Sequence, residues 1–295
     1  MQYTRGRSTD TERASKRDQG DCELFTFLRH DLAPPWCSRI YTMDLSAVIR
    51  DINENPHRER SFYEYPELYE FFQSRVVDRD AHVGLVERFE PSGTNRVLEF
   101  GCGAGPLLAR IENTYDDVMG VDSNGAMLEL AEKRVTNAEL RNADFTEWSA
   151  ADEDRSFDMA VLMGGLLHLT DDQDLELFAE NVYESLRDGG VFVTFFEPFS
   201  DSIENGSREV HSVESGRYSV ERHATSALTS SAGHYTTTYL FVIRDEERGM
   251  TARMGTVFHG RFFTRERLTA AFTNVGFNTI DIINRDGPTV LHAVR

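Results

Sequence analysis

A strand that runs directly into a glycine-rich turn constrains this chain more than any other feature. Residues 97–105 read Val-Leu-Glu-Phe-Gly-Cys-Gly-Ala-Gly, and a helix is predicted from Pro106. Glycine allows positive φ and a close approach of the backbone to a ligand, and a helix N-terminus offers unpaired N–H groups. The segment therefore predicts the first strand, turn and helix of an open α/β sheet that binds a nucleotide-like ligand.

The residues on either side of the glycines distinguish two kinds of ligand. A dinucleotide-binding turn carries glycine or alanine where this chain has Pro106, and Glu99 lies directly before the glycines. A buried carboxylate repels a pyrophosphate but attracts an ammonium group. Glu99 and Pro106 thus favour S-adenosylmethionine over a dinucleotide, although Glu99 alone could also be a structural acid.

Strands and helices are predicted to alternate through the middle of the chain, which indicates a parallel α/β sheet with right-handed crossovers. The predicted strands are 96–100, 117–121, 138–141, 157–163 and 191–196, the last preceded by a turn at 188–190. The predicted helices are 65–89, 106–113, 126–135 and 173–186.

The pattern changes after Pro198. An antiparallel β insert is predicted over about 199–262, because β-rich stretches follow one another there without long helices between them. These stretches are 217–222, 234–243 and 251–259. A helix at 264–275, with Thr264 as its N-cap and Gly276 beyond its end, precedes a terminal hairpin of 279–283 and 289–294 around a turn at 285–288.

Two more acidic residues follow predicted strands at the same edge of the sheet. The carboxylate of Asp122 could accept hydrogen bonds from both ribose hydroxyls, and that of Asp144, beside Phe145, could accept one from an adenine amino group. Taken singly, Asp122 could instead cap a helix and Asp144 could be a solvated loop residue. Together with the Glu99 loop and the turn at 186–190, they resemble the class I S-adenosylmethionine-dependent methyltransferases over about residues 60–295.

This resemblance implies a Rossmann-like α/β fold with a seven-stranded, mostly parallel sheet and an antiparallel last strand from the terminal hairpin. It implies a transferase that uses S-adenosyl-L-methionine. The residues that we expect at the cofactor are Glu99, Gly101, Cys102, Gly103, Gly105, Asp122, Ser123, Met127, Asp144, Phe145 and Met163. Among them, Cys102 is interpreted as a small filler of the loop and not as a nucleophile.

His168 follows the fourth predicted strand, at the edge where open α/β sheets bind ligands. A histidine pKa near neutrality suits a general base, which predicts that His168 is catalytic. The alternative is a histidine that packs within the loop.

The later sequence resembles a narrower group, the amino-sugar N,N-dimethyltransferases of deoxysugar biosynthesis. The similarity rests on Glu197-Pro198, the β-rich insert, residues 235–249 and 262–277, and the final hairpin. In that group a Tyr–acid pair opens the N-terminal helix, matched by Tyr69-Glu70, and a histidine matched by His168 accepts a proton from the sugar ammonium. The resemblance implies that Tyr69 and Glu197 lie near the acceptor, although the apolar residues 164–167 depart from the sugar enzymes.

Three functions remain open at this point. The first is a methyltransferase for a small molecule, at nitrogen or oxygen, with the amine of a nucleotide-linked sugar as the suggested acceptor. The second is a methyltransferase for RNA or protein, and the third is a protein that binds S-adenosylmethionine without catalysis. The presence of Glu99, Asp122, Asp144 and His168 weighs against the third.

The chain is strongly acidic, with 50 acidic and 31 basic residues and a net charge of -19. Nucleic acids and anionic membranes need clusters of positive charge, so we expect neither as a partner. Only Lys16 and Lys133 are lysines, and acidic residues are spread along the whole chain. This distribution is typical of adaptation to concentrated salt and predicts a halophilic, archaeal source.

The cysteines and the N-terminal segment bear on compartment and domain organisation. Cys22, Cys37 and Cys102 show neither paired metal spacing nor an even disulfide framework, so we expect no metal site and a reducing compartment. A cytoplasmic location is predicted, because no apolar signal sequence or bilayer-spanning stretch is evident. Residues 1–42 are expected to be a poorly ordered extension before a methyltransferase domain at 43–295. Met43 is an alternative translation start, and a homodimer is left open as the oligomeric state.

Overall fold

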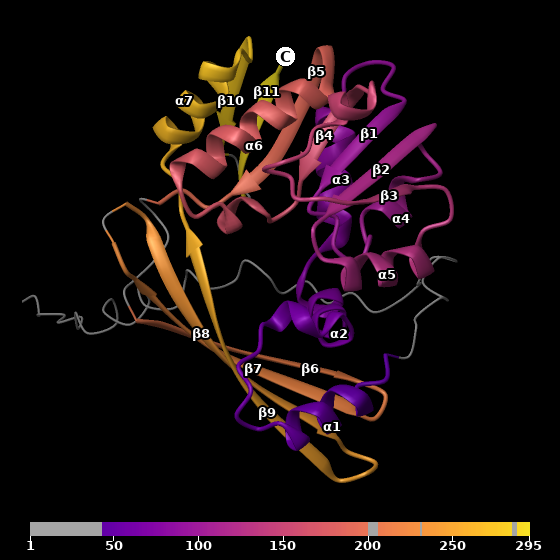
Figure 1. Cartoon of the computed structure of the whole chain (residues 1–295), viewed down its shortest axis with the longest axis vertical. Coiled ribbons are helices and arrows are strands. Elements are labelled where there is room, and N and C mark those ends of the chain that lie inside the picture. Colours follow the sequence, from indigo (N-terminus) through magenta and orange to yellow (C-terminus); the bar gives the residue numbers. More distant parts are fainter. Residues whose placement is uncertain (1–42, 200–205, 231, 285–287) are drawn as a thin grey trace, which may run out of the picture. The chain divides into compact units, whose positions relative to one another are not determined.

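The structure, a computed structural model, describes residues 43–199, 206–230, 232–284 and 288–295 (Figure 1). The predicted N-terminal extension, Cys22, Cys37 and most of the predicted turn at 285–288 lie outside these described residues. Within them, no helix is long and apolar enough to cross a membrane.

Seven strands form the sheet that the sequence predicts, in the order β10-β11-β5-β4-β1-β2-β3. The strands β1, β2, β3, β4 and β5 pair in parallel, whereas β11 pairs antiparallel with both β5 and β10. The predicted fold class, with its antiparallel last strand, is therefore confirmed. The strands are β1 (Arg96–Phe100), β2 (Asp117–Asp122), β3 (Glu139–Asn142), β4 (Phe157–Leu162), β5 (Leu186–Phe196), β10 (Thr279–Ile283) and β11 (Thr289–Val294).

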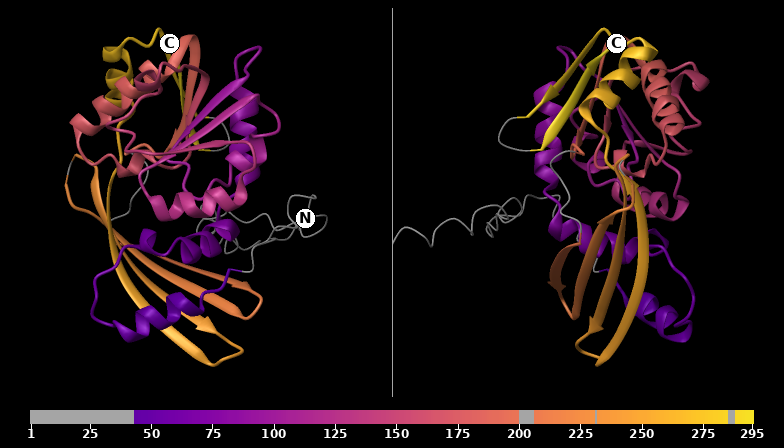
Figure 2. Two further views of the ribbon diagram at one scale, coloured as in Figure 1. Left: turned by 45° about the vertical axis from the view of Figure 1, so that its right-hand side comes forward. Right: turned by 90° about the vertical axis from the view of Figure 1, so that its left-hand side faces the viewer.

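Helices cover both faces of this sheet, because alternate residues of its buried strands are apolar on each side (Figure 2). Val97 and Val161 pack in one core with α3 (Arg79–Phe89), α4 (Leu108–Ile111) and α5 (Gly125–Arg134). Leu98 and Leu162 pack in the other core with α6 (Asp172–Ser185) and α7 (Arg265–Val275). This three-layer packing holds the ends of the parallel strands in fixed positions.

The predicted β insert forms a second, antiparallel sheet in the order β6-β7-β8-β9. Its strands are β6 (Ser207–Ser215), β7 (Tyr218–Leu228), β8 (His234–Asp245) and β9 (Met250–Arg261). One face of this sheet packs against α1 (Ser46–Glu54), the short 3-10 helix η2 (Phe62–Glu64) and α2 (Pro66–Val76), in a core that includes Phe72 and Phe241. The other face exposes large apolar side chains, among them Val210 and Val257.

Several boundaries differ from those predicted. The single helix expected at 65–89 is two helices, because Val77 is extended and the side chain of Asp78 accepts hydrogen bonds from the backbone of Asp80 and Ala81, which starts α3. The helix expected at 106–113 is limited to Leu108–Ile111.

Residues 188–190, predicted as a turn, lie within strand β5. The backbone of Gly189 and Gly190 exchanges hydrogen bonds with Arg295, so β5 begins at Leu186 and shifts register against β4. The strand β6 and helix α1 were not predicted. The helix at 264–275 is confirmed, with Thr264 bonded to the backbone of Arg267 and Gly276 at φ 113°.

Candidate functional site

The glycine turn leaves β1 in a left-handed conformation. Gly101, Gly103 and Gly105 have φ values of 62°, 55° and 68°, which a side chain would strain. An added Cβ at Gly105 would also lie 3.1 Å from the Cβ of Ala131 on α5. The turn therefore needs these glycines to follow its path between β1 and α4, and it leaves the backbone open to a close ligand.

Glu99 lies beside this turn and is only 3% exposed. Its Oε2 atom has no hydrogen-bond partner among the described residues, and burial raises its pKa well above the usual range. A buried, unpartnered carboxyl oxygen is costly unless a ligand satisfies it. The site therefore fits a ligand with a cationic donor, such as the ammonium group of S-adenosylmethionine.

Asp122, at the end of β2, connects two parts of the site. Its Oδ2 accepts a hydrogen bond from the backbone N–H of Gly103 at 2.8 Å, and its Oδ1 accepts one from the backbone N–H of Asn124 at 2.8 Å. Burial raises its pKa. Each carboxylate oxygen keeps a second lone pair, so a ligand hydroxyl can still bind there.

The other residues expected at the cofactor surround the same edge of the sheet. Asp144 is exposed, and its Oδ1 accepts bonds from the backbone and hydroxyl of Thr146, both at 2.8 Å. Phe145 packs against Phe178 and lies next to Gly101. Ser123 is exposed, Met127 and Cys102 are buried, and Met163 is half-buried. Burial raises the pKa of Cys102, which agrees with a filler role.

A pocket of about 250 Å³ begins at this edge and extends to the inner face of the antiparallel sheet. Its walls come from η2, α2 and α3, from β5 and the loop after β4, and from β7, β8 and β9. Aromatic side chains form much of the lining, and none of the described lining residues is acidic. The aromatic residues are Phe62, Tyr63, Tyr69, Phe195, Tyr235, Tyr239, Phe241 and Phe258.

His168 lines this pocket from the 3-10 helix η4 (Leu166–His168). Its Nε2 lies 3.1 Å from the hydroxyl oxygen of Tyr63, and its ring meets Phe258 edge-on, with 5.2 Å between the ring centres. The ring is open to solvent at the pocket wall, yet the surrounding protein atoms lower its pKa. Neutral His168 therefore predominates at neutral pH.

Of the two residues expected near the acceptor, Tyr69 lines the pocket and Glu197 does not. Tyr69, on α2, lines the pocket with its ring centre 5.3 Å from that of Tyr63 and the two rings tilted, and burial raises its pKa. Glu70 points away and forms a 2.7 Å ion pair with Arg134 on α5. Glu197 is exposed, one residue beyond β5, and is not among the lining residues. The pKa of Tyr235 is raised mainly by burial, with a smaller contribution from the charge of Glu197.

Sequence reasoning missed several polar residues of the pocket, among them Tyr63, Arg79, His82 and Arg222. Arg79 has a buried Nε without a hydrogen-bond partner in the described part of the chain, and its charge acts on Glu99. His82 is 6% exposed, and burial lowers its pKa to about 4. The signal for Arg79 and His82 was the helix cap at Asp78, which starts the helix that carries both residues.

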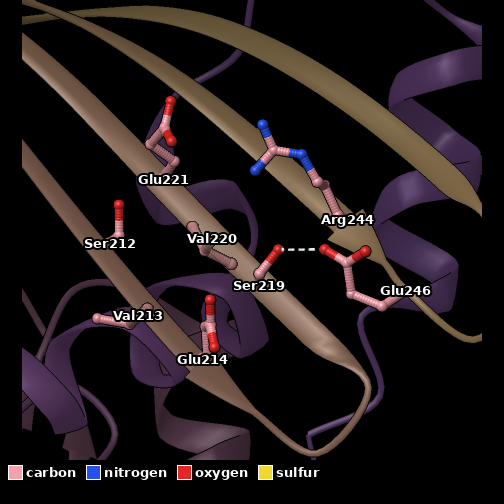
Figure 3. A pocket seen from close by; sticks show the side chains of 8 residues that line it. All are labelled: Ser212, Val213, Glu214, Ser219, Val220, Glu221, Arg244 and Glu246. Carbon is pink, nitrogen blue, oxygen red and sulfur yellow. Dashed lines mark hydrogen bonds between the residues drawn. The ribbon is translucent and has the colours of Figure 1, made fainter.

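A second pocket lies on the antiparallel sheet and differs in character (Figure 3). Glu214, Glu221, Glu246 and Arg244 line it with charged side chains, and Ser219 donates a 2.9 Å hydrogen bond to Glu246. It has no aromatic wall. Across the described ranges, no group of three or more His, Cys, Asp or Glu side chains could hold a metal ion. The aromatic pocket is thus the better candidate for chemistry.

The sequence matches the family model described as a methyltransferase domain, over residues 97–190. It is 27% identical over 197 residues to the dTDP-3-amino-3,6-dideoxy-alpha-D-glucopyranose N,N-dimethyltransferase of Streptomyces fradiae. That match covers 66% of this chain and 74% of the relative. Two further curated methyltransferases are matched over only 47% and 48% of their lengths.

Solved structures share the fold. The S-adenosylmethionine-bound amino pentose methyltransferase CalS10 from Micromonospora echinaspora aligns with a TM-score of 0.68 and 21% identity, over 81% of this chain and 99% of that chain. DesVI from Streptomyces venezuelae aligns with a TM-score of 0.66 and 20% identity, over 84% and 97%. This domain, this fold and these relatives together support a class I S-adenosylmethionine-dependent methyltransferase that resembles amino-sugar methyltransferases.

Proposed function

We propose that this methyltransferase acts on the amine of a nucleotide-linked sugar, in the aromatic pocket between the two sheets. The observation that carries the proposal is His168, a largely neutral histidine that lines this pocket at the edge of the parallel sheet. The Streptomyces fradiae relative, named for a dTDP-linked 3-amino sugar, supports the same acceptor class.

S-adenosylmethionine supplies an activated methyl group on a sulfonium, and the residues around the glycine turn would hold it. We assign its ammonium group to Glu99 and its carboxylate to Arg79, because both have a buried polar atom without a partner in the described chain. Asp122 would bind the ribose hydroxyls, and Asp144 and Phe145 the adenine. Gly101, Gly103 and Gly105 would allow the close approach, with Cys102, Ser123, Met127 and Met163 around them.

Amine methylation requires a free nitrogen lone pair, so a sugar ammonium must first lose a proton. We assign this proton transfer to His168, whose lowered pKa leaves it unprotonated at neutral pH. Tyr69 would contact the sugar from α2, since it lines the pocket beside Tyr63. Glu197 would lie farther out, near Tyr235, where its charge would favour a cationic amine on its way in.

The charge of the lining also favours an acceptor with an anionic part. The guanidinium of Arg222 lies 4.7 Å from the ring centre of Phe72 and 5.4 Å from that of Tyr239. Its Nε has no hydrogen-bond partner among the described residues. In a chain of net charge -19, a pocket without an acidic lining side chain suits the phosphates of a nucleotide sugar.

We further propose that residues 43–295 act as the methyltransferase domain and that the insert at about 199–262 covers the acceptor. The acidic, lysine-poor composition supports a halophilic protein, for which we also propose a cytoplasmic location. A halophilic protein should unfold at higher temperature in concentrated potassium chloride than in dilute buffer. An unfolding temperature that falls as salt is added would contradict this part of the proposal.

The acceptor is tested with methyl-labelled S-adenosylmethionine and four candidates: a dTDP-linked 3-amino sugar, the same sugar nucleotide with a hydroxyl in place of the amine, small free amines, and total tRNA. We expect label only on the amino sugar nucleotide, and a large loss of turnover in His168→Asn with cofactor affinity unchanged. Labelled tRNA or a labelled hydroxyl sugar, with no labelled amine, would refute the amine assignment.

A further inference from the structure

Tyr63 is the residue that touches His168 most directly, and the preceding function does not use it. It lies in η2, whose start is fixed by Ser61: the Ser61 side chain accepts a bond from the backbone of Tyr63 at 3.2 Å, and the Ser61 backbone donates to Glu64 at 2.8 Å. Such a capping box holds a short helix in one conformation. Tyr63 is therefore presented to the pocket from a defined segment.

The Tyr63 hydroxyl and His168 Nε2 are 3.1 Å apart, within hydrogen-bond distance, and their rings meet at 63°. Neutral histidine carries one proton, on Nδ1 or on Nε2. If Tyr63 donated to Nε2, the proton would sit on Nδ1 and neither nitrogen would have a free lone pair for a substrate. If Nε2–H donates to Tyr63, Nδ1 remains free as the base.

A second contact connects Tyr63 to the cofactor side of the site. The side-chain Nδ2 of Asn124 donates a 3.0 Å hydrogen bond to the backbone carbonyl of Tyr63. The Oδ1 of the same side chain caps α5 by accepting from Ala126 and Met127, and the backbone of Asn124 donates to Asp122. The Tyr63 segment is thus hydrogen-bonded to Asn124, which is itself hydrogen-bonded to Asp122, the residue proposed to bind the ribose.

We propose that Tyr63 is a positioning residue, whose hydroxyl oxygen accepts the hydrogen bond from Nε2–H of His168 and leaves Nδ1 to take the proton of the acceptor. This inference rests on the proposed role of His168 as the base. When Nδ1 takes the proton, Nε2–H keeps its bond to Tyr63, so the imidazolium is held in the same orientation. Asn124 fixes the distance between this pair and the cofactor.

Other polar groups of the pocket do not replace this contact. The titratable or charged side chains that share the lining are Tyr69, Arg79, His82, Arg222, Tyr235 and Tyr239. Among the described residues, the hydrogen bond with Tyr63 is the side-chain hydrogen bond that the His168 ring forms. On its other side, His168 meets the apolar ring of Phe258.

The tautomer can be measured without any acceptor. In the full-length protein with 15N-labelled histidine, long-range 1H–15N spectra at neutral pH should show His168 with its proton on Nε2, the signal being identified by its loss in His168→Asn. In Tyr63→Phe, which keeps the ring, we expect a mixture of tautomers. A proton on Nδ1 in the wild type would overturn the proposal.

Kinetics supply the second test, with the amino sugar nucleotide as acceptor. We expect Tyr63→Phe to lower kcat about tenfold with little change in the acceptor KM, which is typical of the loss of a supporting hydrogen bond to a functional histidine. In the His168→Asn background the same change should have little effect. Equal losses in both backgrounds would show that Tyr63 does not act through His168.

Two further variants separate positioning from general damage. Tyr183→Phe, a tyrosine that packs against Phe277 outside the pocket, should leave kcat unchanged. Asn124→Ser keeps a helix-capping oxygen but loses the donor to Tyr63, so kcat should fall while cofactor affinity is largely kept. If the wild type methylates no amine, the proposed function fails, whereas the tautomer measurement still decides the role of Tyr63.

Discussion

Replacing Glu99 by glutamine should stabilise the cofactor-free protein and weaken cofactor binding at the same time. The Glu99 carboxyl is buried with an unpartnered oxygen, and burial raises its pKa. Because the folded-state pKa is raised, folding is penalised increasingly as pH rises above the unfolded value. An unsatisfied buried polar group costs about 1–3 kcal/mol, more when it is charged, so Glu99→Gln should gain about that much at pH 8 and almost nothing at pH 4.

The loss in binding follows from the same geometry. A charge-assisted hydrogen bond contributes about 1.5–3 kcal/mol, so the Kd for S-adenosylmethionine should rise about ten- to a hundredfold in Glu99→Gln. Since Glu99 must be ionised to pair with the ammonium, binding by the wild type near pH 6 should release a proton, and binding by the variant should not.

Chemical denaturation at the two pH values measures the stability, and calorimetric titration in buffers of different ionisation enthalpy measures affinity and proton release. Asp158→Asn is the matched control, because this buried acid is fully bonded to the backbone of Asn95 and Arg96 and to Arg187. It should lose stability without changing the Kd. A destabilised Glu99→Gln variant with wild-type affinity would refute the reasoning.

Two other variants test the packing and electrostatics around the site. Burial lowers the pKa of His82 from 6.5 to about 4, so the free energy of unfolding should fall as pH drops from 6.5 toward 4. In denaturation measurements, His82→Gln should remove up to about 3 kcal/mol of this pH-dependent fall. An unchanged pH dependence would contradict the buried, neutral state of His82. Phe178→Ala should lower the free energy of unfolding by about 3–5 kcal/mol, because this ring is fully buried among Phe100, Phe145 and Phe192. Its neighbour Leu177, 37% exposed, is the control: Leu177→Ala should change stability by about 0.5 kcal/mol or less, and similar losses in both variants would count against this packing.

Features with a local cause could be predicted from the sequence. Thr264 and Gly276 define α7 because a helix cap and a left-handed terminus depend on the residues themselves. The glycine turn, Asp122 and His168 could be placed at one edge because each follows a strand of a parallel sheet. The β-rich composition of β8 and β9, without long helices between them, likewise indicated the insert.

Features that depend on tertiary contacts could not be predicted. Strand β6 has the sequence Ser-Arg-Glu-Val-His-Ser-Val-Glu-Ser, with few apolar residues, and it forms because β7 offers it a full hydrogen-bonded ladder. The apolar pattern of residues 65–89 continues across Asp78, but the Asp78 side chain caps a new helix there and so divides the predicted helix. The contact between Tyr63 and His168 joins residues 105 positions apart and depends on packing of η2 against the pocket.

The central claim is that His168 removes a proton from an amine bound in the aromatic pocket. Its most direct test is the pH dependence of single-turnover methylation of a dTDP-linked amino sugar, with cofactor saturating. The account predicts that the wild-type rate rises with pH through a pKa below 6.5, as the lowered pKa of His168 requires, and that His168→Asn loses this acidic limb together with most of the rate. An unchanged limb and rate in His168→Asn would contradict it.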